Sequence, residues 1–473
     1  MNYLKGKKVL VTIQELEKKE HRGISSYSKS LLKALKKADA EVWLLIGMDY
    51  RKIKFNNKNL INKLLITFSL DYLDNKNHLA NFKKIPIFNL SPEFLFILHL
   101  LFSKNTFDRG NSVELKFTEK IDNPYLKMDR TSYLNNIDGF YIAPYVYEKC
   151  LFSSVKPFKS NVKINLNNFD LFITTAPLNI QPDRSFKNKF FIQTIHDIIP
   201  LEFQPNKQRI KLFFGMLENC SYSNNIFVSE ITKSKFNKIL GSKKLNSNIL
   251  KDAVVYQPPS LIIDEYKKDH IYEKVLNSIS FYNKNKIEPF KYFIFNSSID
   301  ERKNVSLLIE SYLNSNIQNK GIKLIIIGKL KNDEYSYKLK SRIKKNKGII
   351  LTNYINEIQQ SALYIHALSL LSPSLVEGFG IPVLNACCLG LPCYASDCDS
   401  HKEILNLFDF NSYLKIYNTN SKIQWTNIFL ENYSVDIKNI QQIRRQRIDR
   451  YRELSNKFQN NFVNQLDKFC SEF

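Results

Sequence analysis

One loop in the second half of the chain combines two glycines with a carboxylate and leads directly into an expected helix. Its sequence is SPSLVEGFGIPVLN, residues 372–385. Gly378 and Gly380 let backbone N–H groups approach a ligand closely, and Pro382 suits the first turn of a helix, where its missing N–H costs nothing. A helix N-terminus behind such a loop favours a diphosphate. Glu377 fits a hydroxyl-rich group beside that diphosphate, because a carboxylate accepts two hydroxyl hydrogen bonds.

A second loop brings two cations to the start of another expected helix. The sequence NSSIDERKN, residues 296–304, places Arg302 and Lys303 just before a helix that is expected to begin at Val305. Cations at a helix N-terminus oppose its dipole, so an anionic ligand that bridges them explains this placement. A single Arg-Lys pair is commonly a surface feature. Together, on successive strand-helix units, the two loops predict one site for a diphosphate and a hydroxylated group.

Strands and helices alternate around these loops. In the second half, buried strands are expected at residues 292–296, 322–328, 348–354 and 367–373, each followed by a helix. In the first half, strands at 7–13 and 41–47 flank a helix at 21–35. This alternation predicts parallel, doubly wound α/β sheets. Ligands of such sheets bind beyond the carboxyl ends of the strands, and both loops follow a strand there.

The length of the chain predicts two domains. A single hydrophobic core does not grow to 473 residues. We expect an N-terminal Rossmann-like domain over 1–265, in which no element can be placed over about 48–160. A charged, weakly periodic linker is expected over 266–290. A C-terminal Rossmann-like domain follows over 291–450, with a terminal helix over 451–473.

The charge and the cysteines limit the partners and the cofactors. The formal net charge of +24 fits nucleic acid, an anionic membrane or a coding bias toward Lys and Asn. No nucleic-acid-binding motif stands out, so no nucleic acid is expected, whereas peripheral contact with an anionic membrane stays open. The seven cysteines lack a metal or disulfide spacing, which favours free thiols and no metal. Without a signal peptide or a membrane span, the expected location is cytoplasmic, with contact at the inner face of the membrane as an alternative.

Several motifs together resemble retaining glycosyltransferase family 4, which has the GT-B fold. The second half carries NSSIDERKN, LIIIGK, NYI and PSLVEGFGIPVLN, and the first half carries RGISSYSKSLL, TIHDIIP and VSE. HDIIP with RKN is especially similar to lipopolysaccharide and O-antigen mannosyltransferases. The resemblance implies two Rossmann-like doubly wound parallel-sheet domains facing across a cleft. The N-terminal domain would bind the acceptor, and the C-terminal domain would bind the nucleotide sugar.

The resemblance also implies roles for residues of both halves. Lys303, helped by Arg302, would contact the donor diphosphate, and Glu377 would contact the hydroxyls of the transferred sugar. Gly23 would let the first N-terminal loop approach the diphosphate. His196 would lie near the reacting carbon in the cleft; the alternative is a histidine packed at a strand end. The remaining positions implied to bind the donor follow the same motifs: Ile355 at the base, and Gly378, Phe379, Gly380 and Ile381 at the sugar and phosphate.

Two positions depart from the family pattern. Asn385 stands where the family has a second glutamate that accepts hydrogen bonds from the nucleotide ribose. Asparagine offers one neutral acceptor oxygen, so donor binding is expected to lose about 1 kcal/mol. Asn296 replaces the usual glycine and is expected to reshape the diphosphate loop. Asp197, beside His196, is expected to cap its loop.

The function implied is transfer of a hexosyl group, with mannose suggested, from a nucleotide-diphosphate sugar to a glycan or lipid-linked acceptor in bacterial surface polysaccharide synthesis. The enzyme would be a retaining, metal-independent hexosyltransferase without a cofactor, and the leaving phosphate would act as the base. A catalytically weak or inactive scaffold or partner subunit, motivated by Asn385 and Asn296, is the main alternative. An epimerase or a phosphorylase of the same architecture is a further one.

Overall fold

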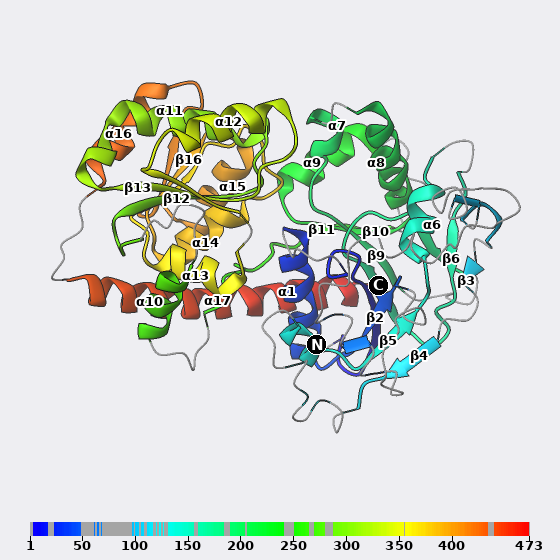
Figure 1. The fold of residues 1–473 in the computed structure, drawn as a ribbon. Coiled ribbons are helices and arrows are strands. Elements are labelled where there is room, and N and C mark those ends of the chain that lie inside the picture. Colours follow the sequence, from blue (N-terminus) through cyan, green and yellow to red (C-terminus); the bar gives the residue numbers. More distant parts are fainter. Residues whose placement is uncertain are drawn as a thin grey trace, which may run out of the picture. The chain divides into compact units, whose positions relative to one another are not determined.

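The computed structural model folds into two compact units, one formed by Met1–Gln257 with Gln459–Phe473 and the other by Pro258–Phe458. Figure 1 shows that both units combine a sheet with helices. The described residues are 3–17, 23–48, 61, 64–65, 68, 97–98, 100–103, 106–107, 111–116, 120, 123, 126, 131–155, 159–183, 190–203, 206–240, 250–263, 269–279, 287–353, 355–433 and 439–472.

The first unit is built on an eight-stranded sheet in the order β11-β10-β9-β7-β1-β2-β5-β4. Its neighbouring strands pair in parallel except β4 with β5. The strands are β1 (Lys8–Thr12), β2 (Glu41–Ile46), β4 (Asn111–Glu114), β5 (Gly139–Ile142), β7 (Leu171–Thr174), β9 (Phe190–Ile195), β10 (Asn224–Phe227) and β11 (Asp252–Val254). A small parallel sheet adds β3 (Thr106–Phe107), β6 (Val162–Ile164) and β8 (Ile180–Pro182).

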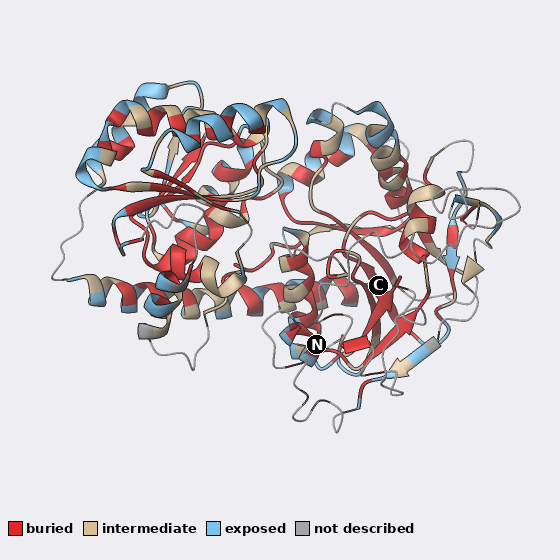
Figure 2. Ribbon diagram, in the orientation of Figure 1, coloured by how far each residue is buried: buried red, intermediate tan, exposed pale blue. Residues whose placement is uncertain are grey.

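Helices that bury one face pack onto this unit. In α1 (Ile24–Lys37), Tyr27, Leu31, Leu32 and Leu35 recur at helical spacing and are buried, as expected for an amphipathic helix on a sheet. Figure 2 shows that the central strands of the large sheet are buried, whereas β4, at its edge, is partly exposed. The other helices of the unit include α6 (Val146–Phe152), α7 (Ile199–Phe203), α8 (Lys207–Asn219) and α9 (Glu230–Leu240).

The second unit is a parallel sheet in the order β14-β13-β12-β15-β16-β17. Counted along the chain, this is the doubly wound order 3-2-1-4-5-6 of dinucleotide-binding domains. Its strands are β12 (Tyr292–Asn296), β13 (Lys323–Ile327), β14 (Ile349–Asn353), β15 (Leu370–Ser372), β16 (Cys393–Ser396) and β17 (Leu414–Tyr417). Its helices include α10 (Asp269–Ser278), α11 (Val305–Ser315), α12 (Glu334–Lys344), α13 (Glu357–Ile365), α14 (Ile381–Leu389), α15 (Asp399–Phe408) and α16 (Lys422–Glu431). The prediction of Rossmann-like parallel sheets is therefore confirmed.

The structure divides the chain differently from the predicted domain boundaries. The stretch expected to be a linker, 266–290, contains α10, because Tyr272 and Leu276 form a buried apolar row one helical turn apart. The expected terminal helix is the end of a longer one, α17 (Ile440–Ser471). Its residues up to Phe458 belong to the second unit, and those from Gln459 belong to the first. In the described part of the chain, no helix has the length and apolar character that crossing a membrane requires.

His366, at the end of α13, predicts an acid-sensitive second unit. The imidazole is fully buried, and its Nδ1 lies 2.8 Å from the Ala362 carbonyl oxygen. Burial lowers the pKa of His366 to about 4, so the unfolded chain takes up this proton first as the pH falls. Protonation of His366 therefore leaves the free energy of unfolding unchanged above about pH 6.5. Between about pH 6.5 and 4 it lowers the free energy of unfolding by about 3 kcal/mol.

Urea unfolding at several pH values between about 7 and 4 measures this loss. His366→Gln, which has no titrating group, is expected to flatten the pH dependence of the unfolding free energy in that window. An equally steep pH dependence in this variant would show that other groups dominate the acid sensitivity.

Candidate functional site

The two loops identified from the sequence directly follow two adjacent strands at the centre of the second sheet. Strands β12 and β15 pair in parallel, and the strand order reverses between them. In doubly wound sheets this reversal opens a crevice outside the carboxyl ends of the strands, where ligands bind. The Leu375 backbone N–H donates to the Arg302 carbonyl oxygen at 2.7 Å and joins the two loops. The loops therefore form one site rather than two.

Lys303 and Glu377 meet at this site. The Lys303 side chain, whose residue is 5 % exposed, forms an ion pair with Glu377 Oε1. The Ser374 hydroxyl donates to the same oxygen at 2.7 Å. Among the described residues, no donor contacts Oε2, the second carboxylate oxygen. Glu377 is thus held by one oxygen and has the other available to accept a hydrogen bond from a ligand.

The surroundings of Glu377 keep its carboxyl group ionised. Burial raises the pKa of Glu377, but the charge of Lys303, the nearby His401 ring and the hydrogen bonds from Lys303 and Ser374 outweigh it and hold the pKa below its usual value. The ionised carboxylate is an acceptor only. It therefore suits hydroxyl donors of a ligand and disfavours an anion, whereas the Lys303 ammonium group suits an anion.

A polar network behind the loop was missed in the sequence. Ser400, in the first turn of α15, donates through Oγ to the Glu377 carbonyl oxygen at 2.7 Å. His401 is fully buried, and its Nδ1 lies 3.0 Å from the Ser396 hydroxyl, which in turn donates to the Ser374 carbonyl oxygen. Burial alone lowers the pKa of His401, but Cys398 and Glu377 raise it above its usual value. The segment from Ser396 to His401 therefore fixes the backbone that carries Ser374 and Glu377.

Arg302 has a partner of its own. Its Nε lies 3.2 Å from Asp300 Oδ1, and its NH2 donates to Asp300 Oδ2 at 3.3 Å. Lys331 also approaches this carboxylate, at 3.4 Å. The structure therefore brings Arg302 into the site loop but directs its guanidinium to Asp300. Its contact with a diphosphate remains a prediction.

The glycine-rich loop ends where α14 begins. Gly380 has φ +103° and is the N-cap residue of α14, with Pro382 in the first turn. Ile381 is the first helical residue, and Phe379 is buried beneath the loop. The positive φ explains why a glycine is needed at position 380. Gly378, Phe379, Gly380 and Ile381 thus form the entry to a helix N-terminus, as predicted for a phosphate site; their contact with a donor remains a prediction.

Gly380→Ala is expected to destabilise the second unit by about 2–4 kcal/mol and to weaken donor binding. A Cβ at this position would lie 3.2 Å from His401 Cδ2 and 3.3 Å from Ile404 Cδ1. Crowding therefore adds to the strain of a positive φ. Thermal unfolding and donor titration measure the two effects.

Gly321→Ala is the matched control for Gly380→Ala. Gly321 has φ +76°, but no atom lies within 4 Å of its Cβ position. This control should cost only about 1–2 kcal/mol and leave donor affinity unchanged. Equal effects of the two variants on donor affinity would contradict a specific role of the loop.

Asn385, which stands at the position of the second glutamate in family 4, is hydrogen-bonded to Ser260 in this structure. Asn385, on α14, is 1 % exposed. Its Oδ1 accepts the Ser260 backbone N–H at 2.7 Å, and its Nδ2 donates to the Ser260 hydroxyl at 3.1 Å. Tyr451 Oη lies 3.5 Å from the same Oδ1. Asn385 thus ties the start of the second unit to α14, and its contact with a ribose remains a prediction.

Two more predicted positions lie at strand ends of the same sheet. Ile355 follows β14 and is half-buried, and the neighbouring residue 354 lies outside the described residues. Asn296, at the end of β12, donates from Nδ2 to the Tyr364 hydroxyl at 2.9 Å. This bond holds the amide against α13. The expected reshaping of the diphosphate loop by Asn296 stays a prediction.

In the first unit, the end of β9 presents His196. Its Nε2 lies 2.8 Å from the Thr175 carbonyl oxygen, which can only accept, so Nε2 carries the hydrogen and Nδ1 is left as an acceptor. Burial lowers the pKa of His196 to about 4, and the ring is therefore neutral near pH 7. Asp197 Oδ1 accepts the Ile199 N–H at 3.0 Å, as expected for a loop cap.

The first helix reaches the same end of this sheet. Gly23, with φ +47°, is the N-cap residue of α1. One turn later, the ring of Tyr27 packs edge-on against the His196 ring, with 4.7 Å between centroids. The structure thus brings the helix that begins after Gly23 together with His196. Tyr27 lies in the quoted GISSYS motif, although the sequence did not mark it as a site residue.

Potential metal ligands do not gather at one place in the described residues. No group of three His, Cys, Asp or Glu side chains in these parts of the chain is placed to hold a metal ion. Asp397, in the DCD stretch, lies 3.5 Å from the Thr419 hydroxyl and 3.4 Å from the Thr419 N–H. Its carboxylate therefore joins the segment after β16 to the segment after β17.

Comparisons with known proteins agree with this architecture. Residues 279–422, which include both loops, match the family described as glycosyl transferases group 1. No curated protein sequence matches the chain. Sucrose-phosphate synthase from Thermosynechococcus elongatus is 12% identical with a TM-score of 0.54, and the match covers 98% of both chains. HepE from Anabaena, in complex with UDP and glucose, is 12% identical with a TM-score of 0.53, over 99% of this chain and 100% of that one. At such identity the likeness shows the fold. The chain therefore has the GT-B fold, and its second unit carries a glycosyl transferases group 1 domain.

Proposed function

We propose that this chain is a glycosyltransferase that moves a hexosyl group from a nucleoside-diphosphate sugar to a glycan or lipid-linked acceptor. The observation that carries the proposal is the Lys303–Glu377 pair at the point where the strand order of the second sheet reverses. It puts a cation for a phosphate next to an ionised carboxylate for hydroxyls. In a nucleotide sugar, one bond links the diphosphate to a sugar that carries several hydroxyl groups.

The chemistry of the transfer follows from these side chains. The bond between the anomeric carbon and the phosphate oxygen breaks, and negative charge develops on the leaving diphosphate. Lys303 and the N-terminus of α14 stabilise that charge, in the role that a metal ion has in other transferases. An ammonium group has three donors, so Lys303 can keep Glu377 while it binds a phosphate oxygen. Glu377 Oε2 accepts sugar hydroxyls and orients the anomeric carbon.

The acceptor hydroxyl completes the reaction. Its oxygen forms the new bond to the anomeric carbon on the face that the phosphate leaves, and its proton passes to the leaving phosphate oxygen. The product keeps the anomeric configuration of the donor. Neutral His196 offers Nδ1 as an acceptor for a substrate hydroxyl. Proton NMR of the product tests this step, and an inverted configuration would contradict it.

The finer assignment rests on the motif resemblance alone. Membership of retaining family 4, a mannosyl donor and a role in lipopolysaccharide synthesis are proposed from HDIIP, RKN and PSLVEGFG. The scaffold alternative rests on Asn385 and Asn296. The engagement of Asn385 with Ser260 gives that residue a structural purpose that does not require loss of activity.

A thermal-shift screen against GDP-, UDP-, ADP- and dTDP-sugars tests the proposal. We expect one nucleotide to raise the melting temperature of the wild type, because a ligand that binds only the folded state stabilises it. Glu377→Ala and Lys303→Ala should each lose this shift while remaining folded by circular dichroism. No shift with any donor, for a folded wild-type protein, would favour the scaffold.

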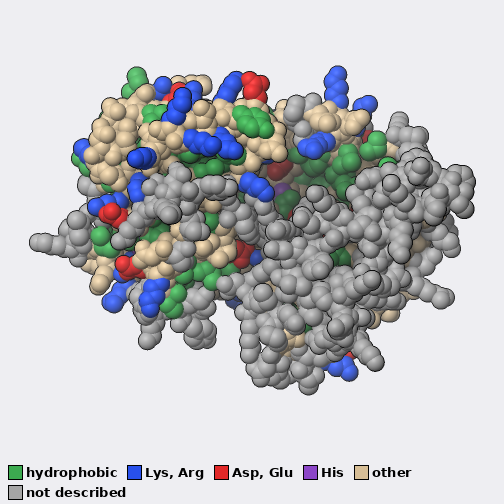
Figure 3. Space-filling view, viewed as in Figure 1, with side chains coloured by type: hydrophobic (Ala, Val, Ile, Leu, Met, Phe, Trp, Pro, Cys, Tyr) green, Lys and Arg blue, Asp and Glu red, His purple; other side chains and the backbone are tan. Residues whose placement is uncertain are grey.

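A cytoplasmic enzyme with peripheral membrane contact is the proposed setting. The net charge is +24, and Figure 3 shows Lys and Arg side chains spread across the visible surface of the second unit. We expect the protein to sediment with vesicles that contain anionic lipid at low salt and to be released near ~0.5 M salt, where charges are screened. Neutral vesicles are the control. Failure to sediment with anionic vesicles would remove this proposal and leave the donor site untouched.

A further inference from the structure

A separate cavity lies in the second unit, at the end of the sheet opposite to the proposed donor site. Its volume is about 430 Å³. Among its lining residues, Pro392 and Tyr413 directly precede β16 and β17, and Leu368 lies two residues before β15. These are the amino ends of the strands, whereas the Lys303 and Glu377 loops leave the carboxyl ends. The cavity is therefore distinct from the proposed donor site, and its size suits a small metabolite.

One face of helix α17 forms a wall of this cavity. Ile443, Gln446, Arg447 and Arg450 line it and recur at helical spacing. Arg447 is 6 % exposed, and its NH1 donates to the carbonyl oxygens of Ile365 and Ala367 at 2.7 and 2.8 Å. Burial lowers the pKa of Arg447 to about 10, so the side chain is still charged near pH 7.

Both arginines retain donors without acceptors. The Nε atoms of Arg447 and Arg450 are buried and have no hydrogen-bond partner among the described residues. Within the described residues, Arg450 makes no ion pair, and its guanidinium lies over the Tyr413 ring, 4.4 Å from the centroid. A buried donor without an acceptor is destabilising. Arg444 and Arg452, outside the lining, have the same unpartnered Nε, so what distinguishes the cavity is the guanidinium charge of Arg450, which an anion in the cavity would balance.

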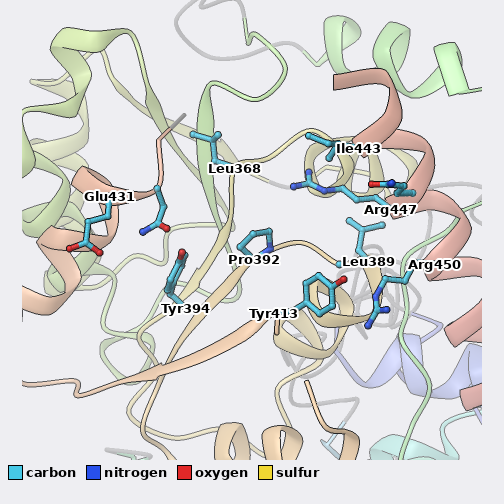
Figure 4. A pocket seen from close by; sticks show the side chains of 12 residues that line it. Leu368, Leu389, Pro392, Tyr394, Tyr413, Glu431, Ile443, Arg447 and Arg450 are labelled. Atoms are coloured by element: carbon cyan, nitrogen blue, oxygen red, sulfur yellow. The ribbon is translucent and has the colours of Figure 1, made fainter. Parts of the chain in front are cut away.

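The backbone makes room for Arg450. Gly390 ends α14 with φ +73°, and a Cβ there would lie 3.0 Å from Arg450 Cδ. The missing side chain lets the arginine lie across the end of α14. Figure 4 shows Arg447 and Arg450 on one side of the cavity and Glu431 on the other. Asn432 lies next to Glu431 in the lining, so the far end carries an acidic and an amide group.

We propose that this cavity binds a small organic phosphate whose other end carries hydroxyl groups. The phosphoryl oxygens accept from Arg447 and Arg450, because planar guanidinium groups match phosphate geometry. The hydroxyls bind Glu431 and Asn432, and the Glu431 carboxylate disfavours a ligand with a second anionic end. A monosaccharide phosphate combines these features, and the proposal does not depend on the function of the donor site.

Isothermal titration calorimetry of the full chain with glucose 6-phosphate tests this inference. We expect wild-type protein to bind glucose 6-phosphate, to bind inorganic phosphate at least tenfold more weakly, and not to bind glucose. Arg450→Gln should weaken glucose 6-phosphate at least tenfold. Arg445→Gln, an exposed position on the same helix outside the cavity lining, is the matched control and should bind like the wild type.

Two further variants locate the ligand and its orientation. Lys303→Gln, in the proposed donor site, should leave glucose 6-phosphate binding unchanged. Glu431→Ala, on a different helix from Arg450, should weaken glucose 6-phosphate but not inorganic phosphate. The inference is overturned if wild-type protein binds no phosphate, if glucose binds as tightly as its phosphate, or if Lys303→Gln rather than Arg450→Gln abolishes binding.

Discussion

Lys303→Ala is expected to lower transfer by about 10²–10³-fold and to destabilise the second unit by about 3–5 kcal/mol. The proposed reaction loses the cation that stabilises the leaving diphosphate, an effect of the size seen when one oxyanion donor is removed. The fold loses the counter-ion of Glu377, since both side chains of this pair are largely buried and an uncompensated buried charge is costly. Steady-state kinetics and urea unfolding measure the two losses separately.

A double-mutant cycle separates stability from catalysis at this pair. Glu377→Ala alone should also destabilise, and the double variant should cost less than the sum, because neither charge is then left alone. Activity should not recover in the double variant. Lys331→Ala removes an exposed cation beside Asp300 and should change stability by less than about 1 kcal/mol. Additive costs with unchanged transfer would contradict the assigned role of the pair.

The sequence was sufficient to predict the two loops, because one combines two glycines with a carboxylate and the other places two cations between a strand and a helix. It also predicted the parallel sheet that supports them. It did not predict that Glu377 would meet Lys303, because that contact depends on β12 and β15 being neighbours, and strand order does not follow from alternation alone. Ser400 and His401 were missed for the same reason, since they reach the loop only after the chain has passed through β16.

The predicted domain boundaries differ from the observed ones where a helix with many charged residues buries one of its faces. Helix α10 was interpreted as a linker because its few apolar residues are surrounded by charges, yet Tyr272 and Leu276 are buried. Helix α17 was predicted to begin too late, because Arg444 and Arg447 suggest an exposed segment. The structure buries both of them. Long arginine side chains can cover apolar surface while their donors bind carbonyl oxygens, and a sequence pattern does not reveal those acceptors.

His196→Ala is expected to lower kcat/KM by about 10²-fold at pH 7. The wild-type ring donates from Nε2 to the Thr175 carbonyl oxygen and, in the proposed reaction, offers Nδ1 as an acceptor to a substrate hydroxyl. Because burial lowers the pKa of His196 to about 4, this acceptor exists throughout pH 5.5–8. The ratio of wild-type to variant kcat/KM should therefore stay constant in that range. It should fall only as the pH approaches 4, where protonation removes the acceptor.

Two near-isosteric variants distinguish a substrate contact from a packed strand-end histidine. His196→Gln can keep the donor to Thr175 but loses the Nδ1 acceptor, whereas His196→Asn can place an amide oxygen near Nδ1 but loses the bond to Thr175. A substrate contact predicts that Asn retains more activity than Gln, while the melting temperatures fall in the opposite order. A purely structural histidine predicts that activity follows stability, so a Gln variant with wild-type kcat/KM would remove His196 from the reaction.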